Sequence, residues 1–174
     1  IEWFREDLLY VKNQELATYN MLTLEKYAYI DIIKCLFRFD SKYVDLIASE
    51  WLNSVVNQLL NNAVLYDCFG LLSIDQNNPQ HRRNEFHRDQ LYLGGMRASV
   101  LILIPLIDFT EENGGTEIVP GSHVFEKAPS QEYMEKHRVK LLPKAGQVYA
   151  IDASVFHRAG VNHSNLMRPA IILR

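Results

Sequence analysis

Hydrophobic positions recur with a helical period in two stretches near the start of the chain. From Ser41 to Asn61 they return every three or four residues, the spacing of one face of an amphipathic helix, and Ser41 is placed to cap it. The stretch from Glu2 to Tyr19 predicts an earlier helix. Between these helices, Tyr27 to Ile32 alternates with period two, which favours a strand.

After the second helix, short apolar runs alternate with polar turns. Ser99 to Asp108 is a nearly continuous aliphatic run, as expected for a strand covered on both faces. The other expected strands are Val64–Ile74, Thr116–Val119, Val139–Leu142, Gln147–Asp152, Ser154–His157 and Arg168–Leu173. Many short strands behind a helical start predict a mainly β fold, a jelly-roll or cupin-like barrel with N-terminal helices.

The length of 174 residues fits one domain. We expect residues 1–62 to form a helical layer with one strand and residues 63–174 to form the barrel core. The chain begins at Ile1 without a methionine and ends at Arg174 inside an expected strand. We therefore expect it to be trimmed from a longer sequence.

Charge and cysteine content narrow the class of protein. A formal net charge of -3 argues against a general nucleic-acid binder, which needs an excess of Lys and Arg. The longest apolar run, Val100 to Ile107, is too short to span a bilayer, and the start lacks the pattern of a signal peptide. Cys35 and Cys68 have no metal-type spacing and predict reduced thiols. We expect a cytoplasmic protein that acts on a small molecule.

The first candidate for chemistry is the His-x-Asp pattern in Phe86-His87-Arg88-Asp89-Gln90. Mononuclear iron(II) oxygenases bind their metal through two imidazoles and one carboxylate on one face of an octahedron, so that the other face stays open. A His-x-Asp pattern near a strand can supply two of these ligands. By itself the pattern is common, and its simpler interpretation is a surface ion pair.

His157 is the candidate third ligand, because it ends an expected strand just before a polar turn. With that turn centred between Asn162 and His163, His157 and Arg168 would lie opposite each other across a hairpin. The planar guanidinium matches the distal carboxylate of a dicarboxylic co-substrate, although a rim ion pair is the simpler role. His163 is the alternative ligand, but it lies in the turn and only five residues before Arg168.

These motifs together resemble a known family. They are the segments 86–90, 113–123, 145–147 and 157–162 followed by Arg168, and they look like the phytanoyl-CoA dioxygenase family over roughly the last 110 residues. The resemblance implies a double-stranded β-helix that uses iron(II), 2-oxoglutarate and dioxygen for substrate hydroxylation, with release of succinate and CO2. It places His87, Asp89 and His157 on iron and Arg168 on the co-substrate carboxylate.

Two departures from the family pattern qualify this resemblance, and Asp89 supports one part of it. Ala159 stands where the family often has a serine or threonine that shares the co-substrate carboxylate. Aliphatic Leu101 and Leu103 replace aromatic or polar residues that commonly line the co-substrate. Asp89 favours hydroxylation, since related halogenases lack this carboxylate.

The remaining candidates have structural or open interpretations. His123 is assigned to fold closure or to the surroundings of the metal, and His81 and His137 are expected in solvent. The segment from Phe125 to Lys140 is either a mobile loop over the barrel mouth or a surface helix. Two other functions stay open. One is a cupin that uses manganese or zinc without 2-oxoglutarate, which leaves Arg168 unexplained; the other is a silent interaction barrel, which leaves the ligand set unexplained.

Overall fold

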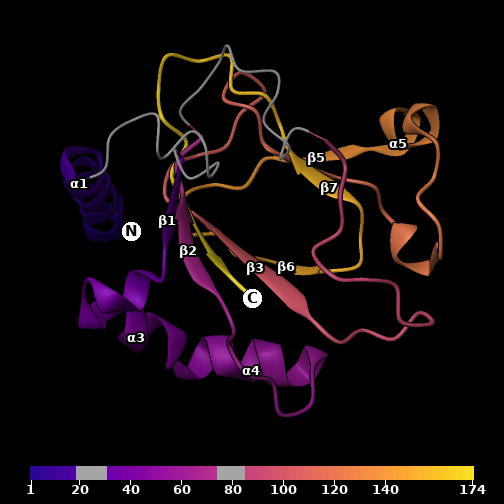
Figure 1. The fold of residues 1–174 in the computed structure, drawn as a ribbon, viewed down its shortest axis with the longest axis horizontal. Coiled ribbons are helices and arrows are strands. Elements are labelled where there is room, and N and C mark those ends of the chain that lie inside the picture. The colour runs from indigo at the N-terminus through magenta and orange to yellow at the C-terminus, as the bar shows by residue number, and fades with distance from the viewer. Residues whose placement is uncertain (19–30, 74–84) are drawn as a thin grey trace.

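Two antiparallel sheets make up the core of the computed structural model, which describes residues 1–18, 31–73 and 85–174 (Figure 1). Within these residues, the larger sheet has the strand order β1-β2-β8-β3-β6 and the smaller sheet has the order β5-β4-β7. The strands are β1 (Ile32–Lys34), β2 (Cys68–Leu71), β3 (Val100–Pro105), β4 (Thr116–Ile118), β5 (Val139–Leu141), β6 (Tyr149–Asp152), β7 (His157–Ala159) and β8 (Ala170–Leu173). This is the expected double-stranded β-helix, a jelly-roll barrel.

Helices cover the outer side of the larger sheet. They are α1 (Glu2–Thr18), α3 (Ser41–Ile47) and α4 (Glu50–Leu59), with a short 3-10 helix, η1 (Leu36–Arg38). Figure 1 shows these helices on one side of the sheets, while α5 (Gln131–His137) lies on the other side, near β5 and β7. The N-terminal helical layer is therefore present as expected.

β3 shows how the core is divided, since it is buried along its whole length. Val100, Ile102 and Ile104 pack in the cluster that includes residues of the helices, and Leu101 and Leu103 pack in the cluster between the two sheets. Side chains of a strand alternate between its faces, so a strand with a core on each side needs apolar residues throughout. This arrangement confirms the expected strand covered on both faces.

The single helix expected from Ser41 to Asn61 is wrong, because the segment forms two helices that break at Ala48 and Ser49. Ser49 has an extended backbone, with ψ 137°, and its hydroxyl donates to the carbonyl of Leu46 at 2.6 Å. The N-cap of the first helix is Asp40 rather than Ser41, and its carboxylate accepts from the Lys42 N–H at 2.8 Å. The spacing of apolar residues continues across Ala48 and Ser49, so the sequence pattern gave no sign of the break.

Several strand boundaries also differ from expectation. Most of the strand expected at residues 27–32 lies outside the described residues; the observed strand covers Ile32–Lys34. The strand expected from Val64 is confined to Cys68–Leu71. His157 begins its strand rather than ending it, because Ser154 turns the chain by donating both its N–H and its hydroxyl to the Asp152 carboxylate.

The expected hairpin between His157 and Arg168 is wrong. β7 pairs with β4 in the smaller sheet, whereas β8 pairs with β2 and β3 in the larger sheet. Asn162 holds the connection by donating to the carbonyls of Ser73 and Leu166 at 2.9 and 2.7 Å. The chain crosses from one sheet to the other here, so His157 and Arg168 face each other across the barrel interior instead of along a ladder.

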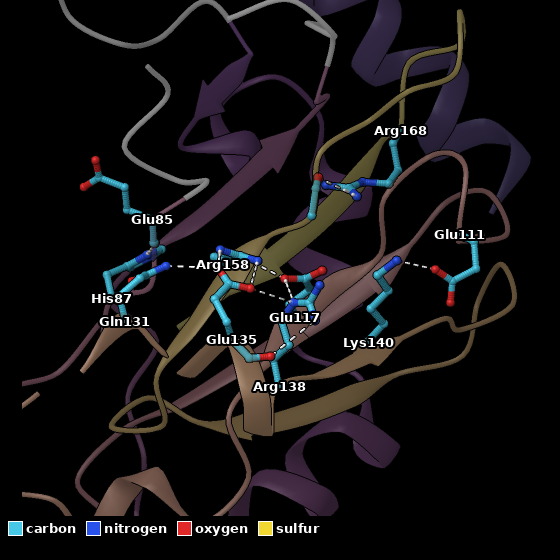
Figure 2. Close-up of polar contacts among 11 residues, drawn as sticks. Glu85, His87, Glu111, Glu117, Gln131, Glu135, Arg138, Lys140, Arg158 and Arg168 are labelled. Atoms are coloured by element: carbon cyan, nitrogen blue, oxygen red, sulfur yellow. Dashed lines mark hydrogen bonds and ion pairs between the residues drawn. The ribbon is translucent and has the colours of Figure 1, made fainter. Parts of the chain in front are cut away.

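The segment from Phe125 to Lys140 contains a surface helix, α5. Arg158 of β7 binds this helix through Glu135, with Nη1 and Nη2 at 2.7 and 3.1 Å from the two carboxylate oxygens. Its Nε donates to the buried Glu117 of β4 at 2.7 Å. Figure 2 shows Arg158 between these two carboxylates, with Arg138 beside them. The ion-pair group ties α5 to the smaller sheet.

Candidate metal centre and its pocket

His87 and His157 lie directly opposite each other, although 69 positions separate them in the sequence. They form an antiparallel bridge in which each main-chain N–H donates to the other residue's carbonyl at 2.9 Å. Their ring centroids are 4.6 Å apart. The bridge adds the segment around His87 to the free edge of β7, so two distant parts of the chain present imidazoles to one point.

The main chain orients both rings in the same way. Nδ1 of His87 lies 2.9 Å from the carbonyl of Glu85, and Nδ1 of His157 lies 2.9 Å from the carbonyl of Val155. A carbonyl can only accept, so each Nδ1 carries the proton and each Nε2 has a free lone pair. Metal-binding histidines commonly have this arrangement.

Asp89 completes the group. Its Oδ1 lies 3.9 Å from Nε2 of His87, and its Oδ2 lies 3.8 Å from Nε2 of His157. Asp89 is fixed by its own N–H, which donates to the carbonyl of Ala153 at 3.0 Å. Across the described ranges, these three residues form a group whose candidate ligand atoms lie within 4.8 Å of one another, a group able to hold a metal ion.

Burial lowers the pKa of His157, and the neighbouring His87 lowers it further, against the opposing effect of Asp89. The neutral imidazole is the form that binds a metal, so a low pKa keeps His157 ready to act as a ligand. The arrangement offers two imidazole nitrogens and one carboxylate to one point; His157 is buried, whereas 38% of the His87 side chain is exposed.

A pocket of about 180 Å³ opens beside the three residues and reaches Arg168. Its walls include Leu101, Leu103 and Ile172 from the apolar cluster between the sheets. Arg168 is 1% exposed, and burial lowers its pKa to about 10. A guanidinium remains charged at neutral pH even with this pKa, so the pocket has a fixed positive charge at one end.

Neutral groups surround the guanidinium of Arg168. Nη1 donates to the carbonyls of Asn113 and Gly160 at 3.0 and 3.3 Å, and Nη2 donates to the hydroxyl of Ser73 at 3.0 Å. Nε is buried without a hydrogen-bond partner. In the part of the chain that the structure describes, no carboxylate lies within 4.0 Å of this guanidinium, and the buried Asp31 acts on its charge only at longer range. A buried cation without a directly paired carboxylate is costly, and an anionic ligand would offset that cost.

Two glycines of the motif segments let the main chain approach Arg168. Gly114 has φ 72°, and a Cβ there would lie 2.0 Å from the carbonyl oxygen of Val161. A Cβ on Gly160 would lie 2.2 Å from the carbonyl oxygen of Gly115. Only glycine permits this packing, which carries the carbonyls of Asn113 and Gly160 to the guanidinium.

Sequence reasoning missed three residues near the site. Thr116 is paired with Ala159 across β4 and β7 and lines the same pocket. Ser73 and Arg174 also contact the site, Ser73 through Arg168 and Arg174 through Asp89, with its Nη1 3.1 Å from Oδ1. The strand patterns could have shown that Thr116 and Arg174 face inward, but the partners of these residues depend on how the two sheets meet.

The other candidates lie apart from the three ligand residues. His163 is exposed, and its N–H donates to the carbonyl of Glu112 in the connection between the sheets. His123 lies in the 3-10 helix η3 (Ser122–Val124), and His81 lies outside the described residues. In the same motif, the buried hydroxyl of Ser122 accepts from the N–H of Phe156 at 2.8 Å, beside His157. The motif thus supports the strand that carries a candidate ligand. Cys35 and Cys68 are free thiols.

A double-stranded β-helix that holds two histidines and an aspartate beside its pocket is the arrangement of cupin-like metal-dependent enzymes. The model of the phytanoyl-CoA dioxygenase (PhyH) family matches residues 19–170, and the chain belongs to this family. Family membership, together with relatives named as dioxygenases, supports an oxygenase function.

Individual relatives are distant in sequence. The chain is 27% identical to the uncharacterized protein Rv1501 of Mycobacterium tuberculosis, over 96% of this chain and 63% of that protein. It is 26% identical to the dioxygenase cdmD of Talaromyces verruculosus, over 74% of this chain and 45% of that protein. The chain thus spans less than two thirds of the length of these relatives.

Solved structures share the fold. EctD from S. alaskensis, crystallised with 2-oxoglutarate and 5-hydroxyectoine, has a TM-score of 0.72 at 20% identity, covering 96% of this chain and 66% of that one. EvdMO1 has a TM-score of 0.66 at 24% identity, covering 82% of this chain and 34% of that one. Among the described residues, no helix is long and apolar enough to cross a membrane.

Proposed function

We propose that this chain is an Fe(II)- and 2-oxoglutarate-dependent dioxygenase that hydroxylates a small organic or lipid-like substrate, with release of succinate and CO2. His87, Asp89 and His157 are the proposed iron ligands, and Arg168 is the proposed partner of 2-oxoglutarate. The observation that carries the proposal is that one pocket joins the three possible ligands to a buried arginine.

The donor set fits iron(II). Two imidazole nitrogens and one carboxylate are ligands of intermediate and hard character, and three ligands leave positions free for co-substrate and dioxygen. Both imidazoles have their Nδ1 atoms directed at main-chain carbonyls, so their Nε2 atoms are available to a metal. Asp89 favours hydroxylation over halogenation, because the carboxylate takes a position that a halide would need.

The Arg168 end of the pocket fits a carboxylate. The guanidinium is buried, is charged at neutral pH and has an unpartnered Nε. Thr116 faces this region beside Ala159, and no described residue makes a hydrogen bond with its hydroxyl. We propose that Thr116 supplies the hydroxyl that the family often places at the position of Ala159. The manganese or zinc alternative would leave the buried charge of Arg168 without a role.

Each part of the site has a separate task in this proposal. When iron(II) and 2-oxoglutarate are bound, they supply dioxygen activation and the oxidative decarboxylation. The three ligand residues hold the metal, and Arg168 with Thr116 orients the dicarboxylate. The walls formed by Leu101, Leu103 and Ile172 exclude water and so limit side reactions.

The decisive experiment is anaerobic addition of iron(II) and then 2-oxoglutarate to the chain, with measurement of the visible metal-to-ligand charge-transfer band. We expect a band in the parent protein and none in His87→Ala. Absence of the band in the parent protein would overturn the proposal.

Arg168 needs its own controls, because removing a buried side chain can unfold the protein. Arg168→Ala and Arg168→Lys are compared with Arg97→Gln, which removes a more exposed arginine paired with Asp152. For each variant, circular dichroism reports folding and a 2-oxoglutarate titration reports affinity. If a folded Arg168→Ala variant titrates like the parent, the assignment of Arg168 is wrong while the metal centre stands.

A further inference from the structure

Arg174 lies at the metal end of the pocket-facing side of β8. Ala170 and Ile172 point from β8 into the pocket, and Ile171 and Leu173 point into the core under the helices. Arg174 continues the inward series and also lines the pocket. The alternation of the strand therefore directs this arginine toward the metal ligands.

The guanidinium of Arg174 bridges two carboxylates. Nη1 lies 3.1 Å from Oδ1 of Asp89, and Nη2 lies 2.6 Å from Oδ2 of Asp67. The side chains are largely buried, with exposed fractions of 18% for Arg174, 12% for Asp89 and 15% for Asp67. Such charge-assisted hydrogen bonds from a planar fork fix direction as well as distance.

The contact occupies one oxygen of Asp89. Oδ1 lies 3.1 Å from Nη1 of Arg174 and 3.9 Å from Nε2 of His87, whereas Oδ2 lies 3.8 Å from Nε2 of His157 and has no contact with Arg174. A carboxylate with one oxygen in a charge-assisted hydrogen bond offers the other oxygen more readily to a metal. The contact with Arg174 therefore favours binding through Oδ2 alone, which keeps the remaining coordination positions open.

We propose that Arg174 is a positioning residue of the metal centre, which holds Oδ1 of Asp89 so that Oδ2 is presented to the cation. The inference rests on the proposed metal centre. It adds that β8 is flanked by an arginine at each end, Arg168 before the strand toward the co-substrate and Arg174 after it toward the metal.

A purely structural role is the competing explanation, and the main chain argues against it. The Arg174 N–H donates to the Asp67 carbonyl at 2.9 Å, and the Tyr66 N–H donates to the Arg174 carbonyl at 2.8 Å. The segment before β2 is thus attached to the end of β8 without the side chain. The guanidinium would be dispensable for that pairing but not for the orientation of Asp89.

Charge repulsion is the second consideration, since a cation near a metal site opposes metal binding. Asp67 compensates for part of it, because its carboxylate pairs with Arg174, although the same oxygen also pairs with Lys34, whose Nζ lies 3.1 Å away. The three side chains together keep one net positive charge beside Asp89. The direct contact with Asp89 is short, and we expect the loss of orientation to outweigh the relief of repulsion when Arg174 is replaced.

The test is titration of the metal-free chain with Co(II), followed by the visible ligand-field spectrum, for the parent, Arg174→Gln, Arg174→Lys, Arg97→Gln and His87→Ala. Loss of a residue that orients a ligand typically weakens metal binding by about 10- to 100-fold. We expect that loss in Arg174→Gln, with an altered spectrum at saturating Co(II). Arg174→Lys should recover part of the affinity, and Arg97→Gln should bind like the parent.

Melting of the metal-free variants separates orientation from stability. A structural role would lower the melting temperature of Arg174→Gln and leave its Co(II) affinity and spectrum unchanged, and that result would overturn the inference. If the parent fails to bind Co(II), or binds it as well as His87→Ala does, the metal centre itself is wrong. A parent that binds Co(II) through His87, with Arg174→Gln matching it in affinity and spectrum, removes only the role of Arg174.

Discussion

At the scale of single residues, the pocket combines a buried charge with unusually close main-chain packing. Arg168 is held by the carbonyls of Asn113 and Gly160, and these are brought near by glycines that no other residue could replace without a clash. Among the described residues, no carboxylate forms a direct ion pair with Arg168, and Asp31 acts on its charge only at longer range. That imbalance is the property of the pocket that most favours an anionic ligand.

Thr116 provides a direct test of how the co-substrate is held. Replacing Thr116 with Val removes a hydroxyl and keeps the shape, and we expect 2-oxoglutarate affinity to fall about tenfold, since a hydrogen bond to a charged group contributes about 1.5 kcal/mol or more. The titration is followed by the charge-transfer band.

The matched control places the hydroxyl on the facing strand. Ala159→Ser in the Thr116→Val background should restore much of the affinity, because residues 116 and 159 are register partners. Equal affinity of Thr116→Val and the parent would exclude Thr116 from the co-substrate site.

Cys68 should be inert to alkylation in the folded protein. Its side chain is 1% exposed, and burial, with a smaller effect of Asp67, raises the pKa of the thiol to about 12. The thiolate is the reactive form, so at pH 8 iodoacetamide should label Cys35 alone. Intact mass should show one label on the native parent, two after denaturation and none on native Cys35→Ser. Rapid labelling of native Cys35→Ser would contradict this picture.

At the scale of elements, His157 depends on how β7 is supported at its start. The Ser122 hydroxyl accepts from the Phe156 N–H, and the Val119 N–H donates to the Phe156 carbonyl at 2.8 Å. These bonds continue the β4–β7 ladder across the residue before the ligand. Within the Pro-Gly-Ser-His motif of residues 120–123, Ser122 is therefore the residue that supports the start of β7.

Ser122→Ala should destabilise the protein. It leaves a buried N–H without an acceptor, which costs about 1–3 kcal/mol. Denaturant unfolding of the metal-free chain measures the loss, with Ser54→Ala on the exposed side of α4 as a control that should change stability little. A loss no larger than that of the control would show that the Phe156 N–H finds another partner.

The end of β3 is tied to the turn before β6 through Asp108. The Ala145 N–H, followed by the Lys144 ammonium, lowers the pKa of the Asp108 carboxyl. A lowered folded-state pKa means that the carboxylate stabilises the fold above its unfolded pKa of about 3.9, and that this contribution disappears as pH falls through the lower folded value.

Asp108→Asn should accordingly be less stable than the parent at pH 7, with a difference that shrinks below about pH 4 and vanishes at more acidic pH. Melting curves across this range measure the difference between the two proteins. A difference that stays constant from pH 7 to acidic pH would rule out the ionised carboxylate as its source.

Sequence patterns predicted elements better than their partners. The apolar run of β3 and the short strand β4 followed from their composition, because each pattern reports which faces a strand buries. The break at Ala48 and Ser49 did not follow, since apolar spacing continues through it. The hairpin of His157 with Arg168 failed because turn residues show where a chain reverses and not which sheet it enters.

At the scale of the whole molecule, the candidate site joins segments that have no local contact in the sequence. His87 and Asp89 come from the segment before β3, and His157 comes from β7. The motifs predicted the identity of these residues. Arg174 and Thr116 could not be assigned in this way, because their places in the site exist only when both sheets are assembled.

A metal that joins these segments should stabilise the entire fold. Binding only to the native state adds about 2.7 kcal/mol at a free metal concentration of 100 times Kd, which corresponds to a rise in melting temperature of about 5–10 °C for a chain of this size. Anaerobic calorimetry with Fe(II) or Co(II) measures the rise, and His157→Ala should abolish it. The same rise in His157→Ala would mean that the metal binds elsewhere.

The alternation of β8 also restricts how this part of the protein can change. Deleting Pro169 would shift the register of the strand by one residue and exchange its two faces. Arg174 would then point into the apolar core under the helices, and the aliphatic Ile171 would point toward the pocket. Substitutions can alter this strand gradually, whereas changes in its length would dismantle the site and the core in a single step.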